Sequence, residues 1–356
     1  MKAFLILEDG TVFQGESVGS TREVISEIVF NTSMTGYLEV TTDPSYAGQA
    51  VVMTYPLIGN YGITPDMESE QPWVDGFIVH EFSRMPSNFR CEGTIQNYLK
   101  KYDIPAISGV DTRALTKLLR ENGTMNGMIT TDEHYDLETV LPRLKAYTTG
   151  AVVEKVTCKE QYTLEGGNYK VALMDYGAKT NIAKSLHERG CEVTVYPATT
   201  PAEEVLATNP DGIMLSNGPG DPEFVKEMIK EVRKFYESGT PIFAICLGHQ
   251  LMALATGATT HRLKYGHRGG NHPVKDLETG KVYISSQNHG YVVEEASVNK
   301  EVAEPAFINV NDKTNEGLKY IGKNIFTVQF HPEANPGPED SAYLFDRFIQ
   351  MMEGDN

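Results

Sequence analysis

Cys246 stands where a nucleophile would be placed between a strand and a helix. It follows the apolar run 241–245 directly and precedes residues with helical apolar spacing. Hydrolases use such a sharp elbow, which requires small residues two positions before and after the nucleophile, here Ala244 and Gly248. The helix N-terminus favours thiolate over thiol, and the N–H of Leu247 can point at an oxyanion. The pattern predicts acyl-transfer chemistry; the alternative is a buried cysteine that only packs.

A base and an orienting group for this nucleophile are offered by His331 and Glu333. Both follow an extended run, so a spacing of two places their side chains on one side of the chain. A carboxylate beside an imidazole selects its tautomer and stabilises the imidazolium form. With Cys246 they make up the nucleophile, base and orienting group of acyl transfer. The alternative is a surface ion pair.

Two more polar segments follow predicted strands. In residues 216–222, Gly218 and Gly220 let the backbone approach a ligand closely, and exposed N–H groups there could complete an oxyanion hole. Taken alone, this segment is also typical of a turn. Residues 287–291 are interpreted as a polar loop after a strand, and by themselves they indicate little.

No metal or phosphate site is predicted. Three histidines lie in a Gly-rich stretch that we interpret as a loop, without Cys or carboxylate at ligand spacing, so we assign a structural role to His261, His267 and His272. Residues 317–323 come close to a phosphate-binding P-loop. However, Asn324 replaces the required Ser or Thr, and the run lies between two strand-like stretches.

The elements around these residues indicate an α/β domain from residue 170 onward. Short apolar runs alternate with helical patterns, which indicates βαβ units and a doubly wound, mostly parallel sheet covered on both faces. The expected strands are 171–174, 193–196, 212–215, 241–245, 282–285, 317–321 and 325–330. The expected helices are 181–189, 202–207, 223–237 and one through 343–349. Ligands bind at the carboxyl ends of strands in such sheets, where Cys246 stands.

The first half is predicted to be a β-rich α+β domain. Residues 4–13 are typical of a hairpin with an Asp9-Gly10 turn, and a helix is expected between an Asp111 N-cap and Gly123. A second helix is expected at 137–145. Apolar periodicity fades between residues 146 and 169. We therefore expect domains at 1–150 and 170–356, joined by a linker at 151–169.

Composition excludes several classes of protein. The 356 residues are 40% hydrophobic, with 31 Lys and Arg against 48 Asp and Glu, a net charge of −17. This acidity argues against binding to nucleic acid or anionic membranes, which needs a basic surface. No apolar run is long enough to span a membrane. The four cysteines are widely spaced and form no C-x-x-C motif, which favours a reducing cytoplasm without disulfides.

Several long motifs in order resemble a known family. The second half is similar to class I glutamine amidotransferases in LSNGPGDP (215–222), ICLGHQ (245–250) and QFHPE (329–333). The first half resembles the carbamoyl-phosphate synthetase small-subunit family in FNTSMTGY (30–37), DPSYAGQ (43–49), YPLIGNYG (55–62) and GVDTRALT (109–116). The stretches DYGAKTNI (175–182) and GHRGGNHPV (266–274) also resemble that subunit, so the resemblance spans essentially the whole chain.

The resemblance implies roles for individual residues. Cys246 would attack the side-chain carboxamide of glutamine to form a thioester, His331 would protonate the departing ammonia and then activate water, and Glu333 would orient His331. Leu247 and Gly218 would offer oxyanion N–H groups. The implied glutamine-binding residues are Ser45, Gly220, Gln250, Asn288, Gly290 and Tyr291. Ala244 and Tyr291 depart from the family, in which Gly and Phe are common at these positions.

The resemblance also implies a partner. The family's large subunit uses ATP and bicarbonate, receives ammonia through an internal tunnel and makes carbamoyl phosphate. This chain would then be the glutaminase half of a heterodimeric ligase without a cofactor of its own, with ATP and Mg²⁺ on the large subunit. Whether the product feeds arginine or pyrimidine synthesis stays open. The alternatives are an amidotransferase for another synthase, such as anthranilate or GMP synthesis, and a non-catalytic glutamine-sensing or scaffolding subunit.

Overall fold

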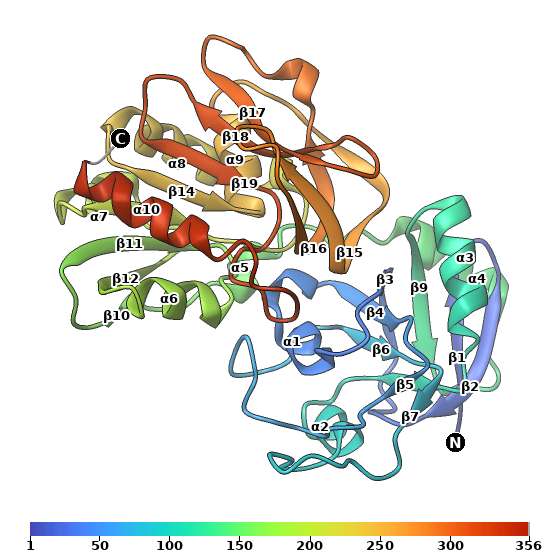
Figure 1. The fold of residues 1–356 in the computed structure, drawn as a ribbon. Coiled ribbons are helices and arrows are strands. Elements are labelled where there is room, and N and C mark those ends of the chain that lie inside the picture. Colours follow the sequence, from blue (N-terminus) through green and yellow to red (C-terminus); the bar gives the residue numbers. More distant parts are fainter. Residues whose placement is uncertain (355–356) are drawn as a thin grey trace. The chain divides into compact units, whose positions relative to one another are not determined.

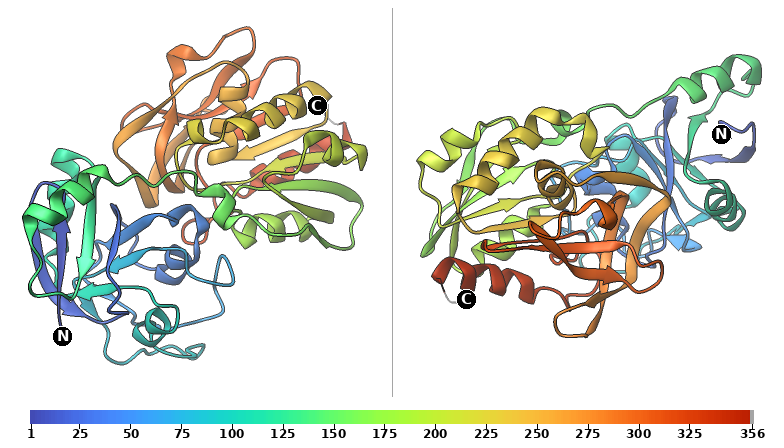
Figure 2. Two further views of the ribbon diagram at one scale, coloured as in Figure 1. Left: turned by 180° about the vertical axis from the view of Figure 1, so that it is seen from behind. Right: turned by 90° about the horizontal axis from the view of Figure 1, so that it is seen from above.

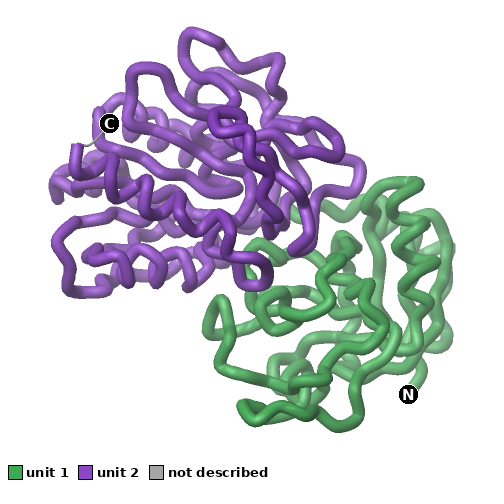
Figure 3. Tube along the Cα trace, viewed as in Figure 1, with its two compact units in different colours: residues 1–150 green, residues 151–356 purple. Residues whose placement is uncertain are grey.

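The computed structural model describes residues 1–354 of the chain. The chain folds into two compact units, which are residues 1–150 and residues 151–356 (Figure 3). Figure 1 labels the helices and strands of both units. Each unit has its own buried apolar clusters, and each is described here by itself.

Unit 1, residues 1–150, is built on a closed barrel with the strand order β1-β2-β8-β6-β4-β3-β9. The barrel strands are β1 Lys2–Leu7, β2 Val12–Ser17, β3 Val24–Asn31, β4 Gln49–Met53, β6 Gly76–Ile78, β8 Ala106–Ser108 and β9 Met125–Thr130. A separate small sheet pairs β5 Leu57–Ile58 with β7 Glu81–Phe82. The antiparallel pairing of β1 and β2 confirms the predicted hairpin.

The helices of unit 1 begin and end largely where their capping residues predict. They are α1 Tyr37–Thr42, α2 Ile95–Lys101, α3 Thr112–Asn122 and α4 Leu137–Ala146, with a 3₁₀ turn η1 at Pro44–Tyr46. The side chain of Asp111 accepts a hydrogen bond from the N–H of Ala114 at 2.9 Å, and Gly123 ends α3 with φ 99°. The predicted helix between these two residues is therefore confirmed.

Unit 2, residues 151–356, contains a ten-stranded sheet with the order β10-β12-β11-β13-β14-β19-β18-β17-β15-β16. Its central strands run parallel from β12 to β19, and the remaining pairings are antiparallel. The parallel strands are β11 Tyr169–Asp175, β12 Cys191–Pro197, β13 Gly212–Leu215, β14 Ile242–Ile245 and β19 Ile325–Val328. The others are β10 Tyr162–Leu164, β15 Thr260–Asp276, β16 Val282–Val293, β17 Ala303–Asn309 and β18 Asn315–Tyr320.

Helices cover both faces of this sheet, as Figures 1 and 2 show. On one face lie α6 Thr180–His187 and α10 Tyr343–Glu353; on the other lie α7 Ala202–Ala207, α8 Lys226–Ser238 and α9 Leu247–Ala255. Strand β14 explains the arrangement, because Phe243 and Ile245 pack in the α6–α10 cluster whereas Ile242 and Ala244 pack in the α7–α9 cluster. A strand buried on both faces needs apolar residues at every position. The predicted doubly wound α/β fold is confirmed, with five parallel strands at its centre and antiparallel strands on either side of them.

Three segments differ from the sequence-based expectations. Residues 151–169, expected as a linker, carry α5 Val153–Val156 and β10, which pairs with β12 at the edge of the sheet. Residues 287–291 and the histidine-containing stretch 261–272, both expected as loops, lie inside β16 and β15. These long antiparallel strands are rich in polar residues and Gly, so apolar spacing does not reveal them; their mutual pairing satisfies the backbone instead.

None of the helices within residues 1–354 combines the length and the apolar character that a bilayer span requires.

Candidate active site

Cys246 occupies a strained turn between β14 and α9. Its backbone adopts φ 53° and ψ −104°, which is unusual for a residue with a side chain, and its N–H donates to the carbonyl of Val328 at 2.8 Å. The residue is buried. Leu247 is the first residue of α9, so its N–H has no acceptor inside the helix. The turn thus places a thiol and a backbone donor side by side.

Glycines next to this turn leave no room for side chains. A Cβ on Gly248 would lie 2.4 Å from the carbonyl oxygen of Leu215. A Cβ on Gly218, in the loop after β13, would lie 2.2 Å from the carbonyl oxygen of Tyr176 and 2.7 Å from a side-chain carbon of Leu247. The Gly218 loop therefore packs directly against the start of α9, where an oxyanion would need donors.

His331 and Glu333 form a buried pair beyond the end of β19. The Nδ1–H of His331 donates to Oε1 of Glu333 at 2.6 Å, and both residues are almost completely buried. This hydrogen bond fixes the tautomer and leaves Nε2 free of a proton when the ring is neutral. Nε2 is buried, and it has no hydrogen-bond partner of regular geometry within residues 1–354.

Lys179 is a third member of this buried group, and it is not among the residues predicted from the sequence. Its ammonium group lies 3.0 Å from Oε1 of Glu333 and also donates to the carbonyl of Ala334, with only 3% of its side chain exposed. A lysine is rarely buried without a partner. Lys179 lies in the DYGAKTNI stretch that follows β11, so the carboxyl end of a parallel strand was the available signal.

The charged forms of Lys179, His331 and Glu333 stabilise one another. Burial lowers the pKa of His331, but the Glu333 carboxylate and the Cys246 thiol outweigh it and raise that pKa to about 10. Burial raises the pKa of Glu333, but Lys179 and His331 outweigh it and lower that pKa to about 2. Cys246 and His331 follow neighbouring strands at the same edge of the sheet, because β14 and β19 pair in parallel with Ile245 opposite Val328. His331 is thus a strong base toward the thiol proton.

Strand β16 brings a further group of the predicted residues to the same place. The Cys246 thiol donates to the carbonyl of Asn288 with a sulfur–oxygen distance of 3.8 Å. Gln250, in the first turn of α9, donates to the carbonyl of Tyr291 at 2.8 Å. The strand also pairs with the segment carrying the base, because the N–H of His331 donates to the carbonyl of Ser286 at 2.9 Å. Asn288, Tyr291 and the intervening Gly290 are therefore held beside the thiol.

Two further predicted glutamine-binding residues, Gly220 and Ser45, lie in a loop and in a 3₁₀ turn, respectively. Gly220 lies in the same loop as Gly218 and adopts φ 90°, a conformation that favours glycine. Ser45 belongs to unit 1, where it lies in η1 and its N–H donates to the side chain of Asp43 at 2.9 Å. The participation of Ser45 in a glutamine site stays a prediction.

Comparisons with known proteins agree for both units. A family model described as "Carbamoyl-phosphate synthase small chain, CPSase domain" matches residues 5–129, and one described as "Glutamine amidotransferase class-I" matches residues 172–351. A carbamoyl phosphate synthase small chain from Clostridium perfringens is 52% identical over 98% of this chain and 99% of its own length. The chain belongs to the carbamoyl phosphate synthase small chain family.

Other members of the family match as completely. The pyrimidine-specific small chain of Bacillus subtilis is 51% identical over 99% of this chain and 96% of its own length. A small chain from Bacillus caldolyticus is 51% identical over 99% of this chain and 97% of its own length. The amidotransferase match contains Cys246, His331 and Glu333, and it also contains Lys179.

A methyl group at Gly248 is expected to disturb the elbow of this family member. We expect Gly248→Ala to lower the free energy of unfolding by about 2 kcal/mol, because the new Cβ must displace the Leu215 carbonyl. Glutamine hydrolysis should fall with it. Chemical denaturation and a glutaminase assay measure the two effects. Gly93→Ala is the matched control, since a Cβ there meets nothing within 4 Å. Equal effects of the two substitutions would contradict the steric argument.

Proposed function

We propose that this chain is the glutamine-hydrolysing small subunit of carbamoyl-phosphate synthase, which releases ammonia from L-glutamine for a large subunit. The observation that carries the proposal is the strained Cys246 beside the buried, charged series His331, Glu333 and Lys179. Membership of the small chain family supports the same activity, since the whole chain is matched.

The first half of the reaction uses Cys246 and His331. Nε2 of His331 takes the thiol proton, and the sulfur attacks the side-chain carboxamide carbon of glutamine. The N–H groups of Leu247 and Gly218 stabilise the negative charge that develops on the carboxamide oxygen. His331 then returns the proton to the nitrogen, the carbon–nitrogen bond breaks, and ammonia leaves behind a thioester on Cys246.

The second half hydrolyses the thioester. His331 accepts a proton from water, and the resulting hydroxide attacks the thioester carbon. The carbon–sulfur bond breaks, glutamate is released, and the proton on His331 returns to the Cys246 sulfur. Through both halves Glu333 keeps Nδ1 of His331 protonated, and Lys179 balances the charge of Glu333.

Glutamine would be held by residues of unit 2 near the thiol. The proposed set in unit 2 is Gly218, Gly220, Leu247, Gln250, Asn288, Gly290 and Tyr291, and the resemblance to the family adds Ser45 of unit 1. Packing of Gly218 against Leu247, and the contacts of Asn288 with Cys246 and of Tyr291 with Gln250, support this set within unit 2. Backbone amides and carbonyls can read the amino-acid end of a small polar substrate.

The partner and the setting follow from the same proposal. The large subunit of a heterodimer would accept the ammonia, bind ATP and Mg²⁺, and use bicarbonate, so this chain needs no cofactor for its own step. The names of the relatives, as small chains, support such a partner. We place the enzyme in the cytoplasm, which fits four cysteines without a disulfide.

Dependence on the partner tests the proposal. Ammonia released into neutral water is protonated and loses its nucleophilicity, so hydrolysis should be coupled to a bound acceptor subunit. We expect the isolated chain to turn over glutamine slowly and to accelerate when the large subunit of its own organism is added. Glutamate release measures the rate, and carbamoyl phosphate formation from glutamine measures the coupling. An isolated chain that is faster than the complex would contradict the coupling, and no glutamate release in either state would contradict the function.

A further inference from the structure

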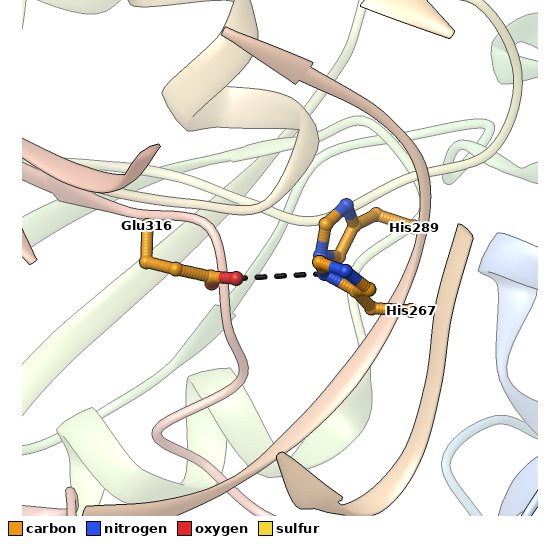
Figure 4. Close-up of side chains that lie close together, drawn as sticks. All are labelled: His267, His289 and Glu316. Carbon is orange, nitrogen blue, oxygen red and sulfur yellow. Dashed lines mark ion pairs between the residues drawn. The ribbon is translucent and has the colours of Figure 1, made fainter. Parts of the chain in front are cut away.

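A second buried cluster lies on the antiparallel part of the unit 2 sheet. His267 on β15, His289 on β16 and Glu316 on β18 point toward one another, as Figure 4 shows. One ligand-type atom from each lies within 4.8 Å of the others, and the residues are 7%, 5% and 0% exposed. None of the three takes part in the proposed reaction.

Each histidine has one ring nitrogen held by an acceptor outside the cluster. Nε2 of His267 lies 2.7 Å from Oδ2 of Asp312, and Nδ1 of His289 lies 2.9 Å from the carbonyl oxygen of Tyr291. With the N–H on these nitrogens, the other nitrogen of each neutral ring presents a lone pair. This is how metal-ligating histidines are oriented in proteins.

The two remaining nitrogens face oxygen atoms. Nδ1 of His267 is buried without a hydrogen-bond partner within residues 1–354, and Oε1 of Glu316 lies 3.5 Å away. Nε2 of His289 lies 3.0 Å from Oε1 of Gln287. Because the amide nitrogen of Gln287 donates to Glu316 at 3.0 Å, the oxygen of that amide is turned to the imidazole. The nitrogen lone pairs and the oxygen atoms would repel one another unless a positive charge lies among them, and a bound cation supplies that charge.

The Glu316 carboxylate is also fixed in place. Its Oε2 accepts from Gln287, and its Oε1 accepts from the side-chain amide of Asn309 at 3.0 Å. Neutral donors orient a carboxylate without cancelling its charge, so the group keeps its capacity to bind a cation. His267 has no carboxylate at ligand spacing in the sequence, which predicts a structural role; the fold supplies Glu316 from another strand.

We propose that His267 Nδ1, His289 Nε2 and the Glu316 carboxylate form a binding site for one divalent transition-metal ion, with Zn²⁺ as the best match. Two imidazoles and a carboxylate are a ligand set that Zn²⁺ accepts, and Oε1 of Gln287 offers a fourth position. Tetrahedral zinc would bring the ligand atoms to about 3.4 Å apart, so the side chains must close inward. The ion would join β15, β16 and β18 and so brace the strand that carries Asn288–Tyr291.

Metal binding by the full chain tests this site. Bound metal is first removed with a chelator, and the chelator is then removed from the protein. The protein is titrated with ZnCl₂ by calorimetry, and its metal content is measured after desalting. We expect one Zn²⁺ per chain and a melting temperature raised by about 5 °C or more when Zn²⁺ exceeds Kd a hundredfold. Absence of stoichiometric Zn²⁺ would overturn the proposal and leave a proton on His267 as the balancing charge.

Variants separate this site from the catalytic thiol. Glu316→Gln should weaken Zn²⁺ binding by at least about 100-fold, and Asp312→Asn by about 10- to 100-fold. His261→Gln is the matched control, because His261 is half-exposed on the same strand and pairs with Glu294 at 2.9 Å. Cys246→Ser should still bind one ion. Loss of binding in Cys246→Ser, with binding kept in Glu316→Gln, would place the metal on the catalytic cysteine and overturn the proposal. Melting of each metal-free variant shows that it folds.

Discussion

Replacement of Cys246 by Ser should abolish glutamine-dependent synthesis and leave ammonia-dependent synthesis intact. The thiol at the elbow is the proposed nucleophile, and a hydroxyl in the same place is a far poorer one near neutral pH. Loss of the nucleophile in a comparable catalytic series costs on the order of 10⁴-fold or more in turnover. Carbamoyl phosphate formed by the complex is measured with glutamine and, separately, with added ammonia.

Cys158→Ser is the matched control for this experiment. Cys158 is another free cysteine of unit 2, partly exposed, and it lies outside the proposed site. It should keep both activities. Persistent glutamine use by Cys246→Ser would refute the assignment of the nucleophile. Loss of the ammonia-dependent reaction as well would show instead that the substitution disturbs the complex, and the glutaminase assignment would then lose its support.

Replacement of Lys179 by Met should damage both stability and catalysis. Removing the ammonium group leaves the buried Glu333 carboxylate with less compensation, which costs about 3–5 kcal/mol in comparable buried pairs. His331 then loses its fixed orientation, and we expect glutamine hydrolysis to fall by about 10²-fold or more. Chemical denaturation gives the stability, and glutamate release gives the rate.

The pH dependence of unfolding in acid shows in which direction the loss of Lys179 should act. The folded-state pKa of Glu333 is about 2, below its usual value of 4.5, because Lys179 and His331 outweigh the effect of burial. The ionised carboxylate therefore contributes its full stability above pH 4.5, and this contribution is lost as the pH falls from 4.5 toward 2. Without Lys179 the pKa of Glu333 rises, so acid unfolding should begin at a higher pH.

Two further variants make the test specific. Lys184→Met is the matched control, because Lys184 is exposed on α6 and pairs with exposed Glu188; the free energy of unfolding of this variant should change by less than about 0.5 kcal/mol. The double variant Lys179→Met with Glu333→Gln removes both charges and should recover stability without recovering activity. A Lys179→Met variant with unchanged acid unfolding would show that Lys179 does not support Glu333.

Much of the fold follows from local patterns. The buried strands of unit 2 are predictable because both faces of the sheet are covered, which makes every position apolar in runs such as β14. Helix α3 is predictable because Asp111 caps it and Gly123 ends it. Strands β15 and β16 cannot be predicted from the spacing of apolar residues, because they are rich in polar residues. The hydrogen bonds of these residues are made with partners that local sequence does not reveal.

The catalytic candidates divide in the same way. Cys246, His331 and Glu333 can be identified from the sequence because the elbow and the two-residue spacing are local features. Lys179 cannot be identified in this way, because its role depends on the buried carboxylate of Glu333, which lies far along the chain. The His267, His289 and Glu316 cluster depends on three strands that meet only in the folded sheet.

By itself, the sequence determined the parallel strands of unit 2, most of its helices, the position of the nucleophile and the family to which the chain belongs. Only the tertiary structure decided which charges face one another in the interior, namely Lys179 with Glu333 and the two histidines with Glu316. The physical reason is that helix caps, turns and the spacing of apolar residues depend on neighbours along the chain. The pairing of buried charges is settled instead by packing among elements that are distant in sequence.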